Sequence, residues 1–294
     1  MTKQNDGTIL VTGATGTVGS EVVKQLSAKG ETIKAAARSA NNNTFGNLKG
    51  VQVVQLDYNN PETLAAAFKG VDKLFLLTPP QSSTLDFTSK LVSQAKNARV
   101  KYIVKQSVIG AEAEPGITPI RLHRQAEKVM EESGIPFTFL RANFFMQSFV
   151  NFFGHSIKTQ GAFYAPAGDA KVSFVDVRDI ASVAVQALIT NDGKHKGKAY
   201  DITGGEALSY GQAAELLSKQ VGKKVNYVNI SDEDARKGMK DMGMDEWTIN
   251  SIIELFEFSR EGYVSAISPI VEQITGNKPI SFSQFAYDYA GAFK

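Results

Sequence analysis

Short apolar runs alternate with segments of helical periodicity along the first half of the chain. The expected strands are Thr8–Thr12, Thr32–Ala37, Val51–Leu56, Asp72–Leu77, Tyr102–Gln106 and Phe137–Arg141. The expected helices between them are Val18–Lys29, Pro61–Lys69, Ser83–Asn97 and Ile120–Ser133. This alternation predicts parallel strands joined by right-handed helical crossovers, and therefore a doubly wound parallel sheet of the α/β class.

The pattern changes after about Phe153. Residues 154–169 are rich in glycine, alanine and proline, which indicates loops with short strands. Two later strands are expected at Val172–Val175 and Ala199–Thr203, with a helix at Asp179–Leu188 between them. The remainder is mostly helical, with expected helices at Ser209–Val221, Ser231–Met242, Asp245–Glu261, Pro269–Thr275 and Ser281–Phe293.

Composition and charge narrow the functional classes. The chain has 294 residues, enough for one large domain or two unequal ones. Its 32 basic and 30 acidic residues give a net charge of +2, which offers no electrostatic reason to expect nucleic acid or a membrane surface as a partner. There is no cysteine, so disulfides, thiol nucleophiles and zinc–thiolate sites are excluded.

The first expected strand leads directly into a glycine-rich turn. Gly13, Gly16 and Gly19 are spaced GxxGxxG, and an amphipathic helix follows. A tight turn of this kind lets backbone amides approach a pyrophosphate at a helix N-terminus. A phosphate-binding loop of the Walker type is excluded, because Ser20 and Glu21 follow the last glycine instead of lysine. The turn predicts a Rossmann dinucleotide-binding domain.

We assign residues 1–153 and 172–203 to this NAD(P)-binding domain. Residues 154–171 and 204–294 are expected to form a smaller, mostly helical C-terminal substrate lobe. In open α/β sheets the ligand binds at the carboxyl edge of the strands.

The end of the second strand indicates which nucleotide is bound. NAD-binding proteins usually carry an acidic residue there, whereas this chain reads Ala35-Ala-Ala-Arg38-Ser39. Arg38 offers a planar cation to a 2′-phosphate, so we expect NADPH to be preferred over NADH. The alternative is that Arg38 is only a surface charge. Asp57, after the third strand, either accepts from the adenine amino group or caps its own loop.

The Tyr–Lys pair of ordinary short-chain dehydrogenases is absent. None of the nine tyrosines has a lysine four residues later, so the usual proton relay cannot form. Near that position His123 and Glu127 lie one helical turn apart. Either Glu127 orients the imidazole and raises its pKa, making His123 a proton donor near the nicotinamide, or the pair only packs the helix. No spacing of His, Asp and Glu predicts a metal site.

Four segments carry a family resemblance. They are TGATGTVG (12–19), HRQAEKVMEESGIPFTFLRANFFMQ (123–147), VSFVDVRDIA (172–181) and TGNKPISFSQFAYDYAGAF (275–293). The chain resembles the NmrA-like atypical short-chain dehydrogenases over nearly its whole length. The bacterial branch of that family includes NADPH-dependent quinone reductases, triphenylmethane dye reductases and redox-sensing regulators that bind NADP(H) without catalysis.

The resemblance implies roles for particular residues. It assigns Gly13, Ala14, Thr15, Gly16, Thr17 and Val18 to the pyrophosphate, Arg38 to the 2′-phosphate, Thr78 and Pro79 to the ribose and nicotinamide side, Gln106 and Ser107 to the nicotinamide, and Asn143, Phe144 and Phe145 to the junction of cofactor and substrate. The family often has proline after Leu-Arg, where this chain has Ala142.

Three functions fit these residues. The first is an NADPH-dependent reductase of a planar, electron-poor acceptor such as a quinone or dye, which needs little proton assistance. The aromatic run Phe144–Phe153 would stack on such a substrate, or belongs in part to the core. The second is a non-catalytic NADP(H)-binding redox sensor. The third is a reductase or isomerase of a specialised metabolite with His123 as the acid.

Location and assembly follow from weaker signals. The first seven residues lack the apolar segment of a signal peptide, so we expect a cytoplasmic protein. No apolar stretch approaches the ~20 residues of a membrane span. Aromatic residues near the C-terminus, including Phe285 and Tyr287, form either a homodimer face or packing within the lobe.

Overall fold

The computed structural model describes residues 7–39, 44–113 and 116–294. The chain packs as two compact units. Unit 1 comprises Met1–Val108, Leu122–Arg141 and Ile180–Tyr200, and unit 2 comprises Ile109–Arg121, Ala142–Asp179 and Asp201–Lys294. The domain boundaries expected from the sequence stay a prediction.

A seven-stranded sheet runs through unit 1 in the order β3-β2-β1-β4-β5-β6-β9. Its strands are β1 (Thr8–Val11), β2 (Thr32–Ala37), β3 (Val51–Gln55), β4 (Lys73–Leu76), β5 (Tyr102–Val108), β6 (Phe137–Ala142) and β9 (Lys198–Ile202). The pairs β1–β2, β1–β4, β2–β3 and β4–β5 are parallel. The order reverses between β1 and β4, which confirms the predicted doubly wound α/β fold.

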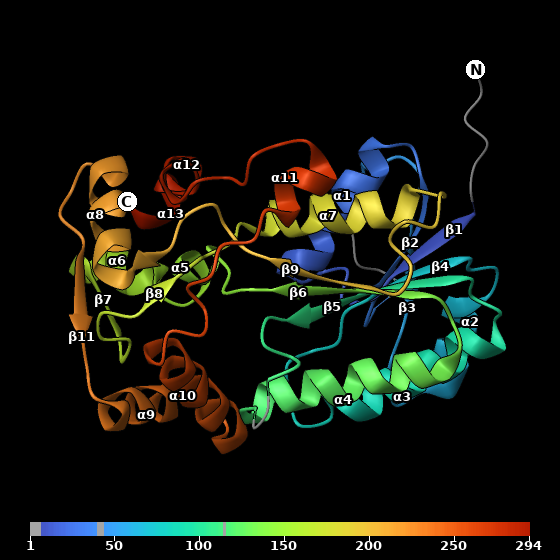
Figure 1. The fold of residues 1–294 in the computed structure, drawn as a ribbon, viewed down its shortest axis with the longest axis horizontal. Coiled ribbons are helices and arrows are strands. Elements are labelled where there is room, and N and C mark those ends of the chain that lie inside the picture. Colours follow the sequence, from blue (N-terminus) through green and yellow to red (C-terminus); the bar gives the residue numbers. More distant parts are fainter. Residues whose placement is uncertain (1–6, 40–43, 114–115) are drawn as a thin grey trace. The chain divides into compact units, whose positions relative to one another are not determined.

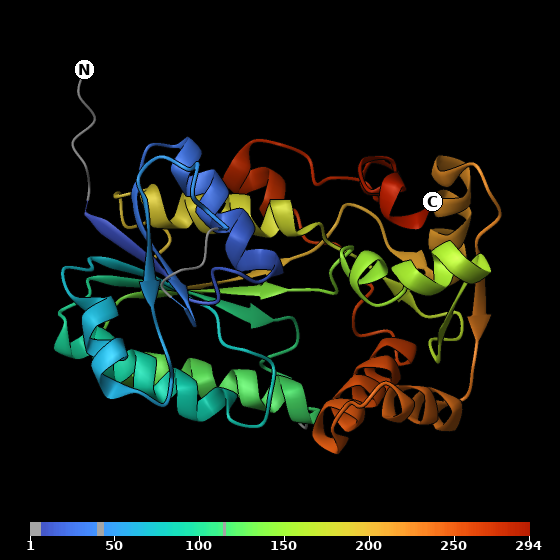
Figure 2. The ribbon, with the colours of Figure 1, turned by 180° about the vertical axis from the view of Figure 1, so that it is seen from behind.

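Helices cover both faces of this sheet. They are α1 (Thr17–Ala28), α2 (Pro61–Phe68), α3 (Thr84–Asn97), α4 (Thr118–Ser133) and α7 (Val177–Ile189). Figure 1 shows α1 and α7 on one face and α2, α3 and α4 on the other, and the reverse view in Figure 2 shows the same two layers. A cluster of buried apolar residues that includes Leu10, Leu74 and Phe139 fills the space under the second layer.

Local capping signals explain where these helices begin. Asn60 accepts a hydrogen bond from the Glu62 amide, and Pro61 occupies the first helical position of α2. Proline costs nothing there, because the first amides of a helix have no intrahelical partner.

Unit 2 is mainly helical. Its elements are α5 (Ser148–Asn151), α6 (Gly154–Gln160), β7 (Ala162–Ala165), β8 (Lys171–Val172), β10 (Leu208–Ser209), α8 (Tyr210–Val221), β11 (Asn226–Asn229), α9 (Asp232–Asp241), α10 (Glu246–Arg260), α11 (Ile270–Thr275), α12 (Phe282–Asp288) and α13 (Ala290–Phe293). Ser209, Ser231 and Ser281 cap their helices as expected, each accepting from a backbone amide three residues later.

Two expectations for unit 2 are wrong, and one strand was not expected. The start of the Gly-rich segment is the helix α6, which ends at Gly161 in the left-handed conformation. Asn226–Asn229 is a strand, because it pairs in parallel with β7. The expected helix Ser281–Phe293 is divided at Tyr289 into α12 and α13. Each error concerns a short element whose conformation depends on its tertiary partner.

Candidate functional site

The glycine-rich turn follows β1 and leads into α1. Gly13 has a φ of +61°, a conformation in which a side chain would be strained. A Cβ atom on Gly19 would lie 2.2 Å from the carbonyl oxygen of Gly13. Any side chain at Gly19 would therefore push the helix away from the turn. The spacing read from the sequence thus corresponds to two separate steric requirements.

Thr12 fixes this turn to the neighbouring strand. Its buried hydroxyl donates to the carbonyl oxygen of Leu77 at 2.9 Å and accepts from the Leu77 amide at 2.9 Å. The end of β1 is thereby held against the segment that follows β4. This contact positions the turn at the point where the order of the strands reverses, which is where open α/β sheets bind ligands.

The geometry of the turn fits the pyrophosphate of a dinucleotide. Thr15, Gly16 and Thr17 are exposed, and Gly16 is the N-cap of α1, where it supplies no capping side chain. No acidic residue stands in the first turn of α1. The partial positive charge of the helix N-terminus is therefore not neutralised by the helix itself. Ala14 and Val18 are buried and contribute packing beneath the turn.

Gln106 offers a hydrogen-bond acceptor that fits the nicotinamide end of a dinucleotide. It is buried on β5, and its side-chain amide nitrogen donates to the carbonyl oxygen of Ser107 at 2.9 Å. Its side-chain oxygen is buried and has no donor among the described residues. A buried acceptor without a donor is costly, so it suits a ligand that carries an amide NH₂ group, as nicotinamide does.

Arg38 lies exposed directly after β2. The described residues contain no carboxylate paired with its guanidinium, and its backbone oxygen accepts from the Gln55 side chain at 3.3 Å. Asp57 closes its own loop, because its Oδ1 accepts from the Asn59 amide at 2.9 Å. The loop-capping interpretation of Asp57 is confirmed, and its contact with adenine stays a prediction.

The remaining predicted residues of unit 1 lie at the ends of β4 and β5. Thr78 is buried and Pro79 is half-buried in the segment after β4, where Thr84 donates to the Pro79 carbonyl at 2.7 Å. Ser107 is fully buried, and its hydroxyl donates to Glu127 at 2.7 Å. The Ser107 side chain is thus engaged in the protein interior.

Glu127 is the centre of a buried polar network. Arg141 donates to its two carboxylate oxygens at 3.0 and 2.8 Å, and Arg124 adds a contact at 3.2 Å. The expected partnership between Glu127 and His123 is therefore wrong: the carboxylate is occupied by Arg141, Arg124 and the Ser107 hydroxyl. A bidentate guanidinium is a better partner for a buried carboxylate than an imidazole, because it supplies two charged donors in a fixed geometry.

His123 instead faces Lys105, which the sequence reading missed. The Nδ1 atom of His123 lies 3.4 Å from the Nζ atom of Lys105. Burial and the nearby Lys105 charge hold the pKa of His123 well below its usual range, opposite to the expected increase. The available signal was a lysine in the middle of an apolar strand, Tyr102-Ile-Val-Lys105.

In unit 2, Asn143 is buried and its side chain is fully bonded. Its Nδ2 atom donates to the Ser173 hydroxyl at 2.7 Å and to the Val264 carbonyl at 2.8 Å, and its Oδ1 accepts from the Phe144 amide at 2.9 Å. Asn143 therefore holds two distant segments of unit 2 together. Phe144 and Phe145 are half-buried. Their contacts with a cofactor stay a prediction.

The aromatic run divides between core and surface. Phe149 is fully buried and packs edge-to-face against Phe163, Phe174 and Phe282, with ring centroids 5.5, 5.3 and 4.9 Å away. Met146 is also fully buried, whereas Phe152 is 65% exposed. Phe149 and Met146 are therefore core residues. The alternative that part of this run is core is confirmed.

The VSFVDVRDIA segment carries a second buried ion pair. Asp176 is fully buried and binds Arg178 through both carboxylate oxygens at 2.9 and 2.8 Å. Arg178 also contacts Asp288 of α12 at 2.7 Å. Asp179 accepts from the Ile280 amide at 2.8 Å, and burial raises its pKa to about 6. This segment of the resemblance therefore stabilises unit 2.

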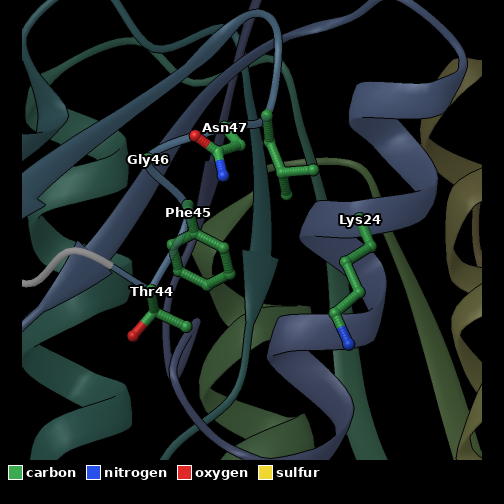
Figure 3. A pocket seen from close by; sticks show the side chains of 6 residues that line it. Lys24, Thr44, Phe45, Gly46 and Asn47 are labelled. Atoms are coloured by element: carbon green, nitrogen blue, oxygen red, sulfur yellow. The ribbon is translucent and has the colours of Figure 1, made fainter.

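Two cavities in unit 1 are lined by none of the predicted site residues. One of about 260 Å³ lies between α1 and residues 44–48; Figure 3 shows Lys24 on the helix, with Thr44, Phe45, Gly46 and Asn47 on the facing segment. Another of about 220 Å³ is lined by Lys73, Lys101 and Lys196 among others. Lys73 and Tyr102 begin β4 and β5, so this second cavity lies at the edge of the sheet opposite the glycine turn.

Two further observations concern the described part of the chain as a whole. None of its helices is long and apolar enough to cross a membrane. It brings together no group of three or more metal-ligating His, Cys, Asp or Glu side chains.

Comparisons with known proteins agree with this fold. The profile of the NmrA-like family matches residues 5–285. The NAD(P)H azoreductase of Xenophilus azovorans is 39% identical over 285 residues, covering 97% of this chain and 99% of the relative. The Escherichia coli NADPH-dependent quinone oxidoreductase, solved with NADPH, superposes with a TM-score of 0.84 at 26% identity over 95% of this chain and 99% of that one. The Citrobacter triphenylmethane reductase, solved with NADP(H), gives 0.83 at 28% identity over 96% and 99%.

Proposed function

This chain belongs to the NmrA-like family, and we propose that it is an NADPH-dependent reductase that delivers hydride to a planar, electron-poor acceptor such as a quinone or a dye. It is an oxidoreductase that lacks the Tyr–Lys pair of ordinary short-chain dehydrogenases. We also propose that the protein forms a homodimer and is located in the cytoplasm.

The observation that carries the cofactor assignment is the combination of the glycine turn with Arg38. Gly13, Gly16 and Gly19 let the backbone approach the pyrophosphate at the N-terminus of α1. Arg38 ends β2 where an acidic residue would select NADH, and it has no carboxylate partner among the described residues. This arrangement supports recognition of a 2′-phosphate.

The protein contributes orientation more than covalent chemistry. When bound, the reduced nicotinamide supplies the hydride. Gln106 offers an unpaired buried oxygen to the carboxamide group and would fix the orientation of the ring. Quinone and dye acceptors are already activated, so the hydride transfer itself does not depend on the Tyr–Lys pair of ordinary short-chain dehydrogenases. The named activities of the azoreductase and quinone oxidoreductase relatives support this acceptor class.

The test is NADPH oxidation, followed by absorbance, with a benzoquinone, a naphthoquinone, an azo dye and a cationic triphenylmethane dye as acceptors. NADH is measured in parallel. We expect turnover with at least one of these acceptors and a clear preference for NADPH. Tight NADPH binding by calorimetry without turnover of any acceptor would contradict the reductase proposal and favour the redox-sensor alternative.

A further inference from the structure

A lysine is buried in the interior of the central sheet. Lys105 lies on β5 with 1% of its surface exposed, and it forms no salt bridge with any described residue. Burying an ammonium group costs several kcal/mol unless its protons find acceptors. Such a residue requires an explanation beyond packing, because an apolar side chain would fill the same space at lower cost.

The two acceptors of Lys105 are a backbone oxygen and an imidazole nitrogen. Its Nζ donates to the Gln106 carbonyl at 2.8 Å and lies 3.4 Å from His123 Nδ1. An ammonium group has only donors, so Nδ1 must accept, and the proton of the neutral His123 ring must stand on Nε2. The contact thus selects one of the two tautomers of His123.

Burial and the surrounding charges determine the protonation states of Lys105 and His123. Glu127 on α4 attracts the ammonium, but its carboxylate is shared with Arg124 of α4 and Arg141 of β6. Burial outweighs the attraction and lowers the pKa of Lys105 to about 8, while the pKa of His123 is held well below its usual range. At neutral pH the pair therefore consists of an ammonium group and a neutral imidazole.

We propose that Lys105 is a positioning residue that fixes His123 as an Nε2–H donor and replaces the proton that His123 gives to the acceptor. The inference rests on the proposed reductase function. In the step, hydride adds to the acceptor, and an acceptor oxygen or nitrogen takes the Nε2 proton. One Nζ proton of Lys105 moves to Nδ1, so the imidazole stays neutral and lysine becomes a free amine. Solvent then protonates Nε2, and the Nδ1 proton returns to Lys105, which restores both the ammonium group and the Nε2–H tautomer. The pair replaces the missing Tyr–Lys relay.

The first test uses the free protein and needs no turnover. The chain has three histidines, so imidazole ¹⁵N NMR spectra resolve them readily. We expect His123 as the neutral Nε2–H tautomer across pH 5.5–7.5. In Lys105→Met the His123 pKa should rise and the tautomers should mix. Lys128→Met is the control, because it removes an exposed lysine from α4, the helix that carries His123. It should change neither the pKa nor the tautomer of His123. Protonation on Nδ1 in the unmodified protein would overturn the proposal.

The second test compares acceptors that differ in their need for a proton. A quinone takes one hydride and one proton, whereas a cationic triphenylmethane dye takes hydride alone. We expect Lys105→Met to lower kcat for the quinone by about 10²-fold, the usual contribution of a positioned acid. Reduction of the cationic dye and the Kd for NADPH should change less than about 3-fold. A purely structural role would slow both acceptors equally, and that outcome would refute the inference.

His123→Gln provides an independent variant if Lys105→Met does not fold. It should give the same difference between the two acceptors, and the double variant should be no slower than either single one, because the residues act as a unit. If no acceptor is reduced, the proposed function fails, and the NMR measurement still decides whether Lys105 fixes the His123 tautomer.

Discussion

Glu127 and Arg141 form a bidentate ion pair inside unit 1, with nitrogen–oxygen distances of 3.0 and 2.8 Å and a carboxylate that is completely buried. The pair joins α4 to β6, and Ser107 extends it to β5. It thereby fixes the helix that carries His123 against the strand that carries Lys105. The orientation of the candidate relay depends on this contact.

We expect Glu127→Gln to lower the free energy of unfolding by about 3–5 kcal/mol, because it leaves the buried Arg141 guanidinium without its counter-charge. Urea denaturation followed by circular dichroism measures the change. Glu131→Gln is the matched control on the same helix; its side chain is 37% exposed, and its pair with Arg124 should contribute less than about 1 kcal/mol. Equal effects of the two substitutions would contradict the structural role of the buried pair.

Gly19→Ala should reduce NADPH binding strongly. The new Cβ atom would lie 2.2 Å from the Gly13 oxygen, so α1 must move away from the turn. We expect a loss of stability of about 1–3 kcal/mol as well, as for other overpacked sites. Gly238→Ala in α9 is the control, because nothing lies within 4 Å of its Cβ position. That control should bind NADPH normally and gain up to about 1 kcal/mol.

Arg38→Ala should raise the Kd for NADPH by about 10–100-fold, the value of lost charge-assisted hydrogen bonds, and leave the Kd for NADH nearly unchanged. Calorimetry with both nucleotides provides the measurement. Lys49→Ala removes one exposed cation from the segment before β3 and serves as the control for net charge. If Arg38→Ala weakened both nucleotides alike, Arg38 would not recognise the 2′-phosphate.

Asp179 should make stability depend on pH. Burial, with a contribution from Asp176, raises its pKa from 3.8 to about 6. The folded protein therefore holds this proton more tightly than the unfolded chain, so stability falls as pH rises from about 4 to 6. The loss approaches about 3 kcal/mol for a shift of this size.

Asp179→Asn should remove that dependence, because an amide does not titrate. Its oxygen can still accept the hydrogen bond from the Ile280 backbone. Thermal unfolding between pH 4 and 7 tests this expectation. Asp241→Asn, at an exposed position, should leave the profile unchanged. If stability instead increased from pH 4 to 6 equally in the wild type and in both variants, other carboxylates would dominate the pH dependence.

Hydrophobic periodicity and turn chemistry were sufficient to predict most of unit 1. All six strands expected before residue 142 are present within two residues of their predicted ends. Burial of the central strands on both faces produces apolar runs, and capping residues such as Asn60 mark the helices between the strands. The glycine spacing and the absence of an acid after β2 are equally local signals, and they fixed the expected cofactor class.

Only the tertiary structure decided which polar side chains meet. A helical spacing of four places His123 and Glu127 near each other, but Arg141 lies closer to the carboxylate and Lys105 faces the imidazole. Likewise, Asp57 and Asn143 bond within the protein. Sequence periodicity determines which face of an element is buried. The partner of each buried polar group depends on neighbouring strands and helices that lie far away along the chain, because every such group must find a hydrogen bond where the fold brings one.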